Sequence, residues 1–84
     1  MMQKSIQIKL EKGLEARPVA MLVQVASQFE STVYINADDR KVNAKSIMGM
    51  MSLGLASGEQ VTVVAEGNDE GTAIEEIEKF LSGN

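Results

Sequence analysis

The chain has 84 residues, of which 44% are hydrophobic and 24% charged, and its net charge is -4 at pH 7. These values predict one ordinary globular domain spanning residues 1–84, because a chain of this length can bury only a single core. The sequence contains no cysteine and no histidine. It therefore excludes disulfides, thiolate sites, and the commonest general base and metal ligand.

The amino-terminal sequence alternates polar and apolar residues and lacks the apolar block of a signal peptide. No segment of the sequence is long and apolar enough to span a membrane. We therefore expect a cytoplasmic protein that does not bind membranes. The net negative charge also disfavours direct binding to nucleic acid, because that affinity depends on cationic contacts with phosphates.

The first periodic segment runs from Ser5 to Leu10, where every second residue is apolar, as in a half-buried strand. The period changes after it, and Arg17-Pro18 begins a helix that we expect to end near Gln28. Proline favours a first helical turn, where its missing N–H costs no hydrogen bond. The apolar stripe of this helix consists of Val19, Leu22, Val23 and Ala26.

Two alternating segments, residues 33–37 and 41–44, flank the turn residues Asp38-Asp39-Arg40 and predict a β-hairpin. Ser46 then precedes a short apolar run, which is typical of a serine that caps the start of a helix. This second helix is short, because small and flexible residues end it around residues 54–58.

The last strand covers residues 61–65, and Gly67-Asn68 ends it. The acidic pair Asp69-Glu70 favours the start of a final helix through its interaction with the helix dipole, and Ser82-Gly83 ends that helix. The predicted order is therefore β-α-β-β-α-β-α. One apolar face on each strand favours a two-layer sandwich in which the other face of the sheet stays open.

One candidate site is the loop of residues 13–18, Gly-Leu-Glu-Ala-Arg-Pro, which leads into the first helix. Backbone N–H groups at a helix start bind anions, and Arg17 would add a charged partner for a phosphate or a carboxylate. The competing interpretation is structural, with Glu15 capping the helix and Arg17 in water. The residues alone leave both interpretations open.

A second candidate is the short helix that follows Ser46. A helix of about two turns cannot bury apolar side chains all round. If Met50 and Leu53 point inward, the other apolar side chains, Ile47, Met48 and Met51, are at least partly exposed. Methionine is common at adaptable binding surfaces, and a phosphate on Ser46 would lie at the positive end of the helix dipole. The alternative is that all these side chains are core and the serine is only a cap.

Paired carboxylates are the remaining candidates for catalysis. Asp38 and Asp39 lie in the predicted hairpin turn, and Glu66 and Asp69 lie in a loop, with no general base beside them. Solvated turns explain both pairs better. The sequence also lacks the spacings of phosphate-binding Gly-rich loops and of metal sites. We therefore expect no enzyme activity, no metal and no cofactor.

Two blocks of the sequence resemble HPr of the phosphoenolpyruvate-dependent sugar phosphotransferase system: residues 13–18, and residues 45–49 (Lys-Ser-Ile-Met-Gly) with Ser52-Leu53. The resemblance extends over nearly the whole chain. It implies an α+β fold, a two-layer open-faced sandwich with an antiparallel four-stranded sheet of order 1-4-2-3 and three helices on one face. The family's phosphate-accepting histidine corresponds to Glu15, and its charge-stabilising arginine corresponds to Arg17.

Because Glu15 replaces the nucleophile, the resemblance implies a regulator rather than a phosphocarrier. In the Gram-positive branch of the family, HPr kinase/phosphorylase phosphorylates the serine that corresponds to Ser46. The Crh type (catabolite repression HPr) also lacks the histidine, and its serine-phosphorylated form is a corepressor of a LacI-type transcription factor, catabolite control protein A. This chain is similar in design, with glutamate where Crh usually has glutamine.

The resemblance thus implies phosphorylation at Ser46, with Arg17 as a contact for an anion or partner. The implied partner surface consists of Glu15, Ala20, Ile47, Met48 and Met51. Two alternatives stay open. In the first, the chain is a true phosphocarrier in which Glu15 is an engineered substitution. In the second, it is an unphosphorylated binding module that inhibits a metabolic enzyme.

Overall fold

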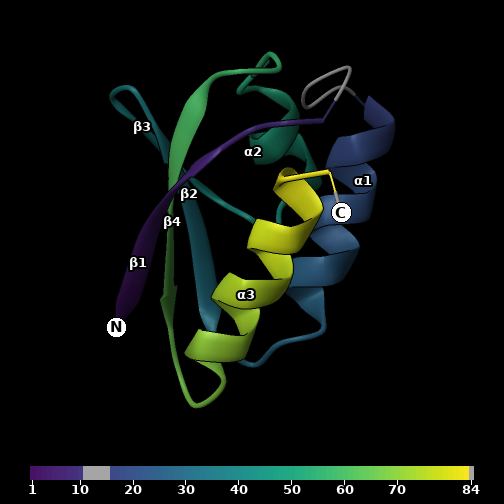
Figure 1. Cartoon of the computed structure of the whole chain (residues 1–84). Coiled ribbons are helices and arrows are strands. Elements are labelled where there is room, and N and C mark those ends of the chain that lie inside the picture. Colours follow the sequence, from purple (N-terminus) through teal and green to yellow (C-terminus); the bar gives the residue numbers. More distant parts are fainter. Residues whose placement is uncertain (11–15, 84) are drawn as a thin grey trace.

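The computed structural model describes residues 1–10 and 16–83, which form a sheet covered on one side by helices (Figure 1). The strands are β1 (Met2–Gln7), β2 (Thr32–Ala37), β3 (Arg40–Asn43) and β4 (Gln60–Glu66). The helices are α1 (Ala16–Ser27), α2 (Ile47–Met51) and α3 (Glu70–Leu81). Their order along the chain is the predicted β-α-β-β-α-β-α.

The sheet has the order β1-β4-β2-β3, and its neighbouring strands are antiparallel. This confirms the α+β class and the strand order 1-4-2-3 that the family resemblance implied. The register places apolar residues of neighbouring strands opposite one another, so that Ile35 pairs with Val42 on one side and with Val63 on the other. One face of the sheet is therefore apolar, and the helices cover it.

The core lies between this apolar face and the helices. Each strand contributes alternate residues, because successive side chains of a strand point to opposite faces. The largest fully buried side chains include Ile8, Leu22, Ile35, Met50, Ile77 and Leu81. The opposite face of the sheet is mainly polar, and on it the Lys41 ammonium lies 4.4 Å from the centre of the Tyr34 ring.

Strand β1 begins and ends earlier than the predicted strand of residues 5–10. It ends at Gln7 because its partner β4 begins at Gln60, the residue that pairs with Gln7. The backbone of Ile8 bonds instead to the loop before β4, where its N–H donates to the carbonyl of Glu59 at 2.9 Å. The alternation of apolar residues thus continues past the last paired residue. For this reason the periodicity alone placed the strand too late.

The hairpin forms as predicted, with a shorter turn. Ala37 pairs with Arg40, so the turn consists of Asp38 and Asp39, and the arginine belongs to β3. Asp38 has a φ of 54°, a conformation that aspartate adopts more readily than most residues. Helix α2 also ends earlier than expected, because the backbone N–H of Ser52 bonds back to the carbonyls of the helix and closes its last turn.

Candidate functional site

Ser46 begins helix α2. Its backbone is extended, and its Oγ accepts a hydrogen bond from the backbone N–H of Gly49 at 3.3 Å. This is the contact that a helix N-cap makes with the third helical residue. The predicted cap is therefore confirmed, and the side chain of Ser46 remains exposed.

Helix α2 divides its apolar side chains between core and solvent. Met50 is fully buried, and Leu53 just after the helix packs against the core. The side chains of Ile47, Met48 and Met51 are 46%, 82% and 52% exposed. This agrees with the expectation that two inward residues leave the others at the surface. We call these three residues the α2 outer surface.

Two cations hold the ends of α2 to the rest of the fold. The Nζ of Lys45 donates to the carbonyl of Phe29, just after α1, at 2.7 Å. The guanidinium of Arg40, on β3, donates to the carbonyl and the hydroxyl of Ser52 at 2.7 and 2.6 Å. Ser52 belonged to the sequence block that resembles HPr, but neither its contact with Arg40 nor a place for Arg40 in this site was predicted. Because the contact joins residues of two different elements, no local pattern in the sequence signals it.

Helix α1 packs against α2 and carries two residues of the predicted surface. Arg17 is exposed in the first turn of α1, and Ala20 is half-buried. Glu15 lies outside the described residues, and so does the cap that it was expected to form in the structural interpretation. Met21 is 51% exposed and was missed as a candidate, although the predicted apolar stripe of this helix already left it out.

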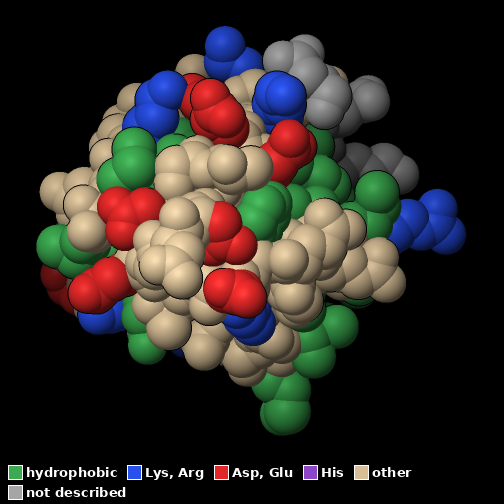
Figure 2. Space-filling view, turned by 90° about the horizontal axis from the view of Figure 1, so that it is seen from below, with side chains coloured by type: hydrophobic (Ala, Val, Ile, Leu, Met, Phe, Trp, Pro, Cys, Tyr) green, Lys and Arg blue, Asp and Glu red, His purple; other side chains and the backbone are tan. Residues whose placement is uncertain are grey.

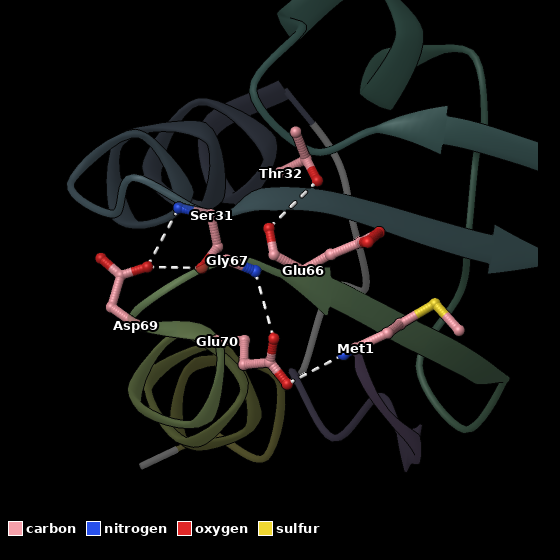
Figure 3. A network of polar contacts seen from close by, with 7 residues as sticks. All are labelled: Met1, Ser31, Thr32, Glu66, Gly67, Asp69 and Glu70. Atoms are coloured by element: carbon pink, nitrogen blue, oxygen red, sulfur yellow. Dashed lines mark hydrogen bonds and ion pairs between the residues drawn. The ribbon is translucent and has the colours of Figure 1, made fainter.

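A polar network joins the turn before α3 to the loop before β2 (Figure 3). The Asp69 carboxylate accepts hydrogen bonds from the backbone N–H groups of Glu30 and Ser31 and from the Ser31 hydroxyl. The Ser31 hydroxyl and these N–H groups hold the pKa of Asp69 below its usual value. Asp69 is thus a structural acceptor, whereas the sequence predicted a solvated residue at the start of the final helix.

Glu70 extends this network to the amino terminus. Its carboxylate accepts the backbone N–H of Gly67 at 3.1 Å and lies 3.2 Å from the amino group of Met1. The Gly67 N–H, and then the amino terminus, hold the pKa of Glu70 below its usual value. Further Asp and Glu side chains are spread over this end of the molecule, which Figure 2 shows from below.

The chemistry of the α2 site is that of a surface hydroxyl beside apolar side chains. Within residues 1–10 and 16–83, no group of three or more carboxylate, histidine or cysteine side chains comes together to hold a metal ion. Of the helices described, none has the length and apolar character needed to cross a membrane. Ser46 is accessible to an external enzyme, and its neighbours are accessible to a protein partner.

Known proteins resemble this chain over nearly its whole length. Residues 2–83 match a family described as "PTS HPr component phosphorylation site". The chain is 49% identical to the HPr-like protein Crh of Halalkalibacterium halodurans over 81 residues, which cover 96% of each chain. It is 46% identical to the HPr-like protein Crh of Bacillus subtilis over 81 residues, which cover 96% of this chain and 95% of the relative.

The fold is also similar to a solved structure. The crystal structure of a phosphocarrier protein HPr from Bacillus anthracis superposes with a TM-score of 0.93, at 42% identity over 95% of each chain. The relatives therefore include proteins named HPr-like and a protein named as a phosphocarrier.

Proposed function

The chain belongs to the HPr family of the phosphotransferase system, and from this premise we propose that it is a regulatory protein of carbon catabolite control. HPr kinase/phosphorylase attaches a phosphoryl group to Ser46. The phosphorylated protein then binds a LacI-type catabolite control transcription factor as its corepressor. We place this protein in the cytoplasm, as a regulator that neither carries phosphate between proteins nor catalyses a reaction.

The observation that carries the proposal is the position of Ser46 beside the α2 outer surface. The hydroxyl is exposed, and the residue that follows it in the chain is Ile47, the first of the three outward apolar side chains. Apolar side chains that a domain leaves together at its surface favour contact with another protein. A single partner surface can therefore contact the serine and the apolar residues together.

Phosphorylation changes the charge of this site strongly. A phosphoserine carries about -1.5 to -2 charge at pH 7 and three strong acceptor oxygens. A partner with an arginine opposite Ser46 would form charge-assisted hydrogen bonds with it, while apolar side chains of the partner cover the α2 outer surface. Binding then requires both the phosphate and the apolar contacts, so the phosphate determines when the complex forms.

Exposure of the protein to HPr kinase and ATP tests the first step. Intact mass should show the addition of one phosphoryl group. Ser46→Ala should remove this addition, whereas Ser57→Ala, which changes another exposed serine, should leave it intact. A wild-type chain that gains no phosphoryl group would contradict the proposal. Unphosphorylated protein that binds and inhibits a metabolic enzyme would favour the stand-alone binding module.

A phosphocarrier is the second candidate, because the matched family is described by its phosphorylation site and a solved relative is named as a phosphocarrier. Glu15 lacks the imidazole that this transfer uses, and an acyl phosphate on a carboxylate is a different intermediate that water hydrolyses. Glu15→His followed by incubation with phosphorylated enzyme I separates the two candidates. Rapid transfer to the variant would favour a carrier with a substituted histidine, and no transfer would favour a diverged regulator.

A further inference from the structure

Two sets of hydrogen bonds connect strand β3 to Ser46 across helix α2, and they meet at the backbone of Gly49. Arg40 donates to the carbonyl of Ser52 through Nη1 at 2.7 Å and to its Oγ through Nη2 at 2.6 Å. The Ser52 hydroxyl donates to the carbonyl of Gly49 at 2.6 Å. The N–H of Gly49 donates to the Oγ of Ser46 at 3.3 Å. This series of contacts thus ends at the proposed phosphorylation site.

Arg40 determines the direction in which the Ser52 hydroxyl donates its hydrogen bond. A serine hydroxyl has one proton to donate and lone pairs to accept. Because Nη2 of Arg40 supplies the hydrogen that the Ser52 oxygen accepts, the hydroxyl's own proton is left for the carbonyl of Gly49. The second donor of the planar guanidinium fixes the Ser52 carbonyl, so the fork orients both groups of the cap at once.

Helix α2 needs such support, because it has only five residues. A helix this short gains too few internal hydrogen bonds to offset the cost of starting it, and its last carbonyls lack helical partners. Contacts from outside the helix must therefore fix its geometry. Arg40 provides one of them from β3, a strand whose position the sheet already determines.

Gly49 connects this contact to Ser46, because its N–H group donates to the Ser46 oxygen. A Cβ at Gly49 would lie 3.4 Å from the Oγ of Ser46 and 3.7 Å from the Cβ of Val42 on β3. The Gly49 backbone therefore lies close to both the serine and the strand. A shift of Gly49 changes the direction of the N–H group that holds the Ser46 oxygen.

We infer that Arg40 is a positioning residue for the phosphorylation of Ser46. Through Ser52 and Gly49 it holds the Ser46 hydroxyl in the orientation in which its oxygen is presented to the phosphoryl donor. This inference rests on the proposed function, and it concerns acceptor geometry. Arg40 is engaged at the carboxyl end of α2, whereas the phosphoryl group is added at the amino end.

Kinase kinetics test this role. Arg40→Ala should lower kcat for Ser46 phosphorylation roughly 3- to 10-fold, because it removes the two exposed hydrogen bonds to Ser52. The change in KM should be smaller, because the α2 outer surface is intact. Lys41→Ala is the matched control. It removes the same charge from the next residue of β3, on the opposite face, where Lys41 contacts Tyr34. It should leave kcat unchanged.

Two more variants test the route. Arg40→Lys keeps the charge and cannot donate through a fork, so it should restore kcat only in part. Ser52→Ala removes the hydroxyl between Arg40 and Gly49 and should lower kcat by a similar factor. In the double variant, the two substitutions should lower kcat by less than the product of their separate effects, because both remove the bond between Nη2 of Arg40 and the Ser52 hydroxyl. Only the Arg40 bond to the Ser52 carbonyl is left for the second substitution to remove. Fully additive effects of the two substitutions on the free energy of activation would contradict the idea that Arg40 acts on Ser46 through Ser52.

A measurement without the kinase separates this inference from the proposed function. In the NMR spectrum of the free protein, Arg40→Ala should shift the Gly49 amide signal and speed its hydrogen exchange, while the midpoint of urea denaturation stays close to that of the wild type. An unchanged Gly49 signal, or an unchanged kcat in a phosphorylated chain, would overturn the role of Arg40. A wild type that the kinase never phosphorylates would instead overturn the proposed function.

Discussion

The two ends of the molecule use their surface residues in opposite ways. Near the top of Figure 1 lies helix α2, whose outer apolar side chains are exposed, and the hydroxyl of Ser46 just before it is also exposed. At the bottom, the polar groups of the turn between β4 and α3 form hydrogen bonds within the protein. Ser31, which donates hydrogen bonds to Asp69 of this turn, is only 1% exposed. Side chains that find their partners inside the chain stabilise the fold. Those that lack such partners at the α2 end are the ones available to another protein.

Two serines of the same chain differ in burial and in hydrogen bonding. Ser31 donates its hydroxyl to Asp69 and is buried against Gly67. Ser46 accepts one long hydrogen bond and keeps its side chain in solvent. Substitutions at the lower end should therefore change stability, and substitutions at the α2 outer surface should change binding.

At the lower end of the molecule, the largest effect on stability is expected from Gly67→Ala. Its φ is 154°, and a Cβ there would lie 2.6 Å from the Oγ and 2.7 Å from the Cα of Ser31. Because these distances are too short, the backbone at Gly67 or Ser31 must move. We therefore expect a loss of about 2–4 kcal/mol in the free energy of unfolding. Gly54→Ala is the control, because its φ is 58° with nothing near the new Cβ, and it should cost about 1–2 kcal/mol. Equal losses would show that Ser31 does not restrict the turn.

A smaller loss of stability is expected when the pH is lowered. The hydrogen bonds of Ser31 and Glu30 lower the pKa of Asp69 in the folded state, so the unfolded chain takes up its proton first as the pH falls. The stability that Asp69 provides is complete above its unfolded pKa and is lost as the pH falls through its lower folded pKa. Urea midpoints should therefore decrease below about pH 4.

Asp69→Asn removes this titration and should weaken the decrease in acid. Some decrease should remain, because the pKa of Glu70 is lowered in the same direction. If Asp69→Asn and the wild type lost stability in acid equally, Asp69 would not contribute to the network as described.

The smallest effect on stability is expected from Met48→Ala. Its side chain is 82% exposed, so the free energy of unfolding should change by no more than about 0.5 kcal/mol, while partner binding weakens. Met50→Ala in the same helix is the contrast, because its side chain is fully buried and truncation should cost about 2–5 kcal/mol. Strong destabilisation by Met48→Ala would mean that this side chain belongs to the core.

The sequence predicted the elements of the fold well where a repeating pattern and a cap coincided. Ser46 before an apolar run predicted the start of α2. The ends of β1 and α2 were less predictable, because Gln60 on another strand determines one and the backbone N–H of Ser52 closes the other. The strand order came from the family resemblance, since periodicity does not tell which strands are neighbours.

The candidate site was also predictable only in part. Ile47, Met48 and Met51 followed from the limited area that a short helix can bury. Arg40 was not predictable, because its partner Ser52 is reached only when β3 and α2 pack together. The role of Asp69 was equally hidden, since its hydrogen bonds reach Ser31 and Glu30, far away in the sequence.

The most direct test of the account is binding of the Ser46-phosphorylated protein to the catabolite control transcription factor. The comparison uses unphosphorylated protein, Ser46→Ala treated with kinase, and phosphorylated Met48→Ala. We predict tight binding only by the phosphorylated wild type, with binding weakened by loss of either the phosphate or the Met48 side chain. Equal binding by phosphorylated and unphosphorylated protein would contradict the central claim that Ser46 and the α2 outer surface act together.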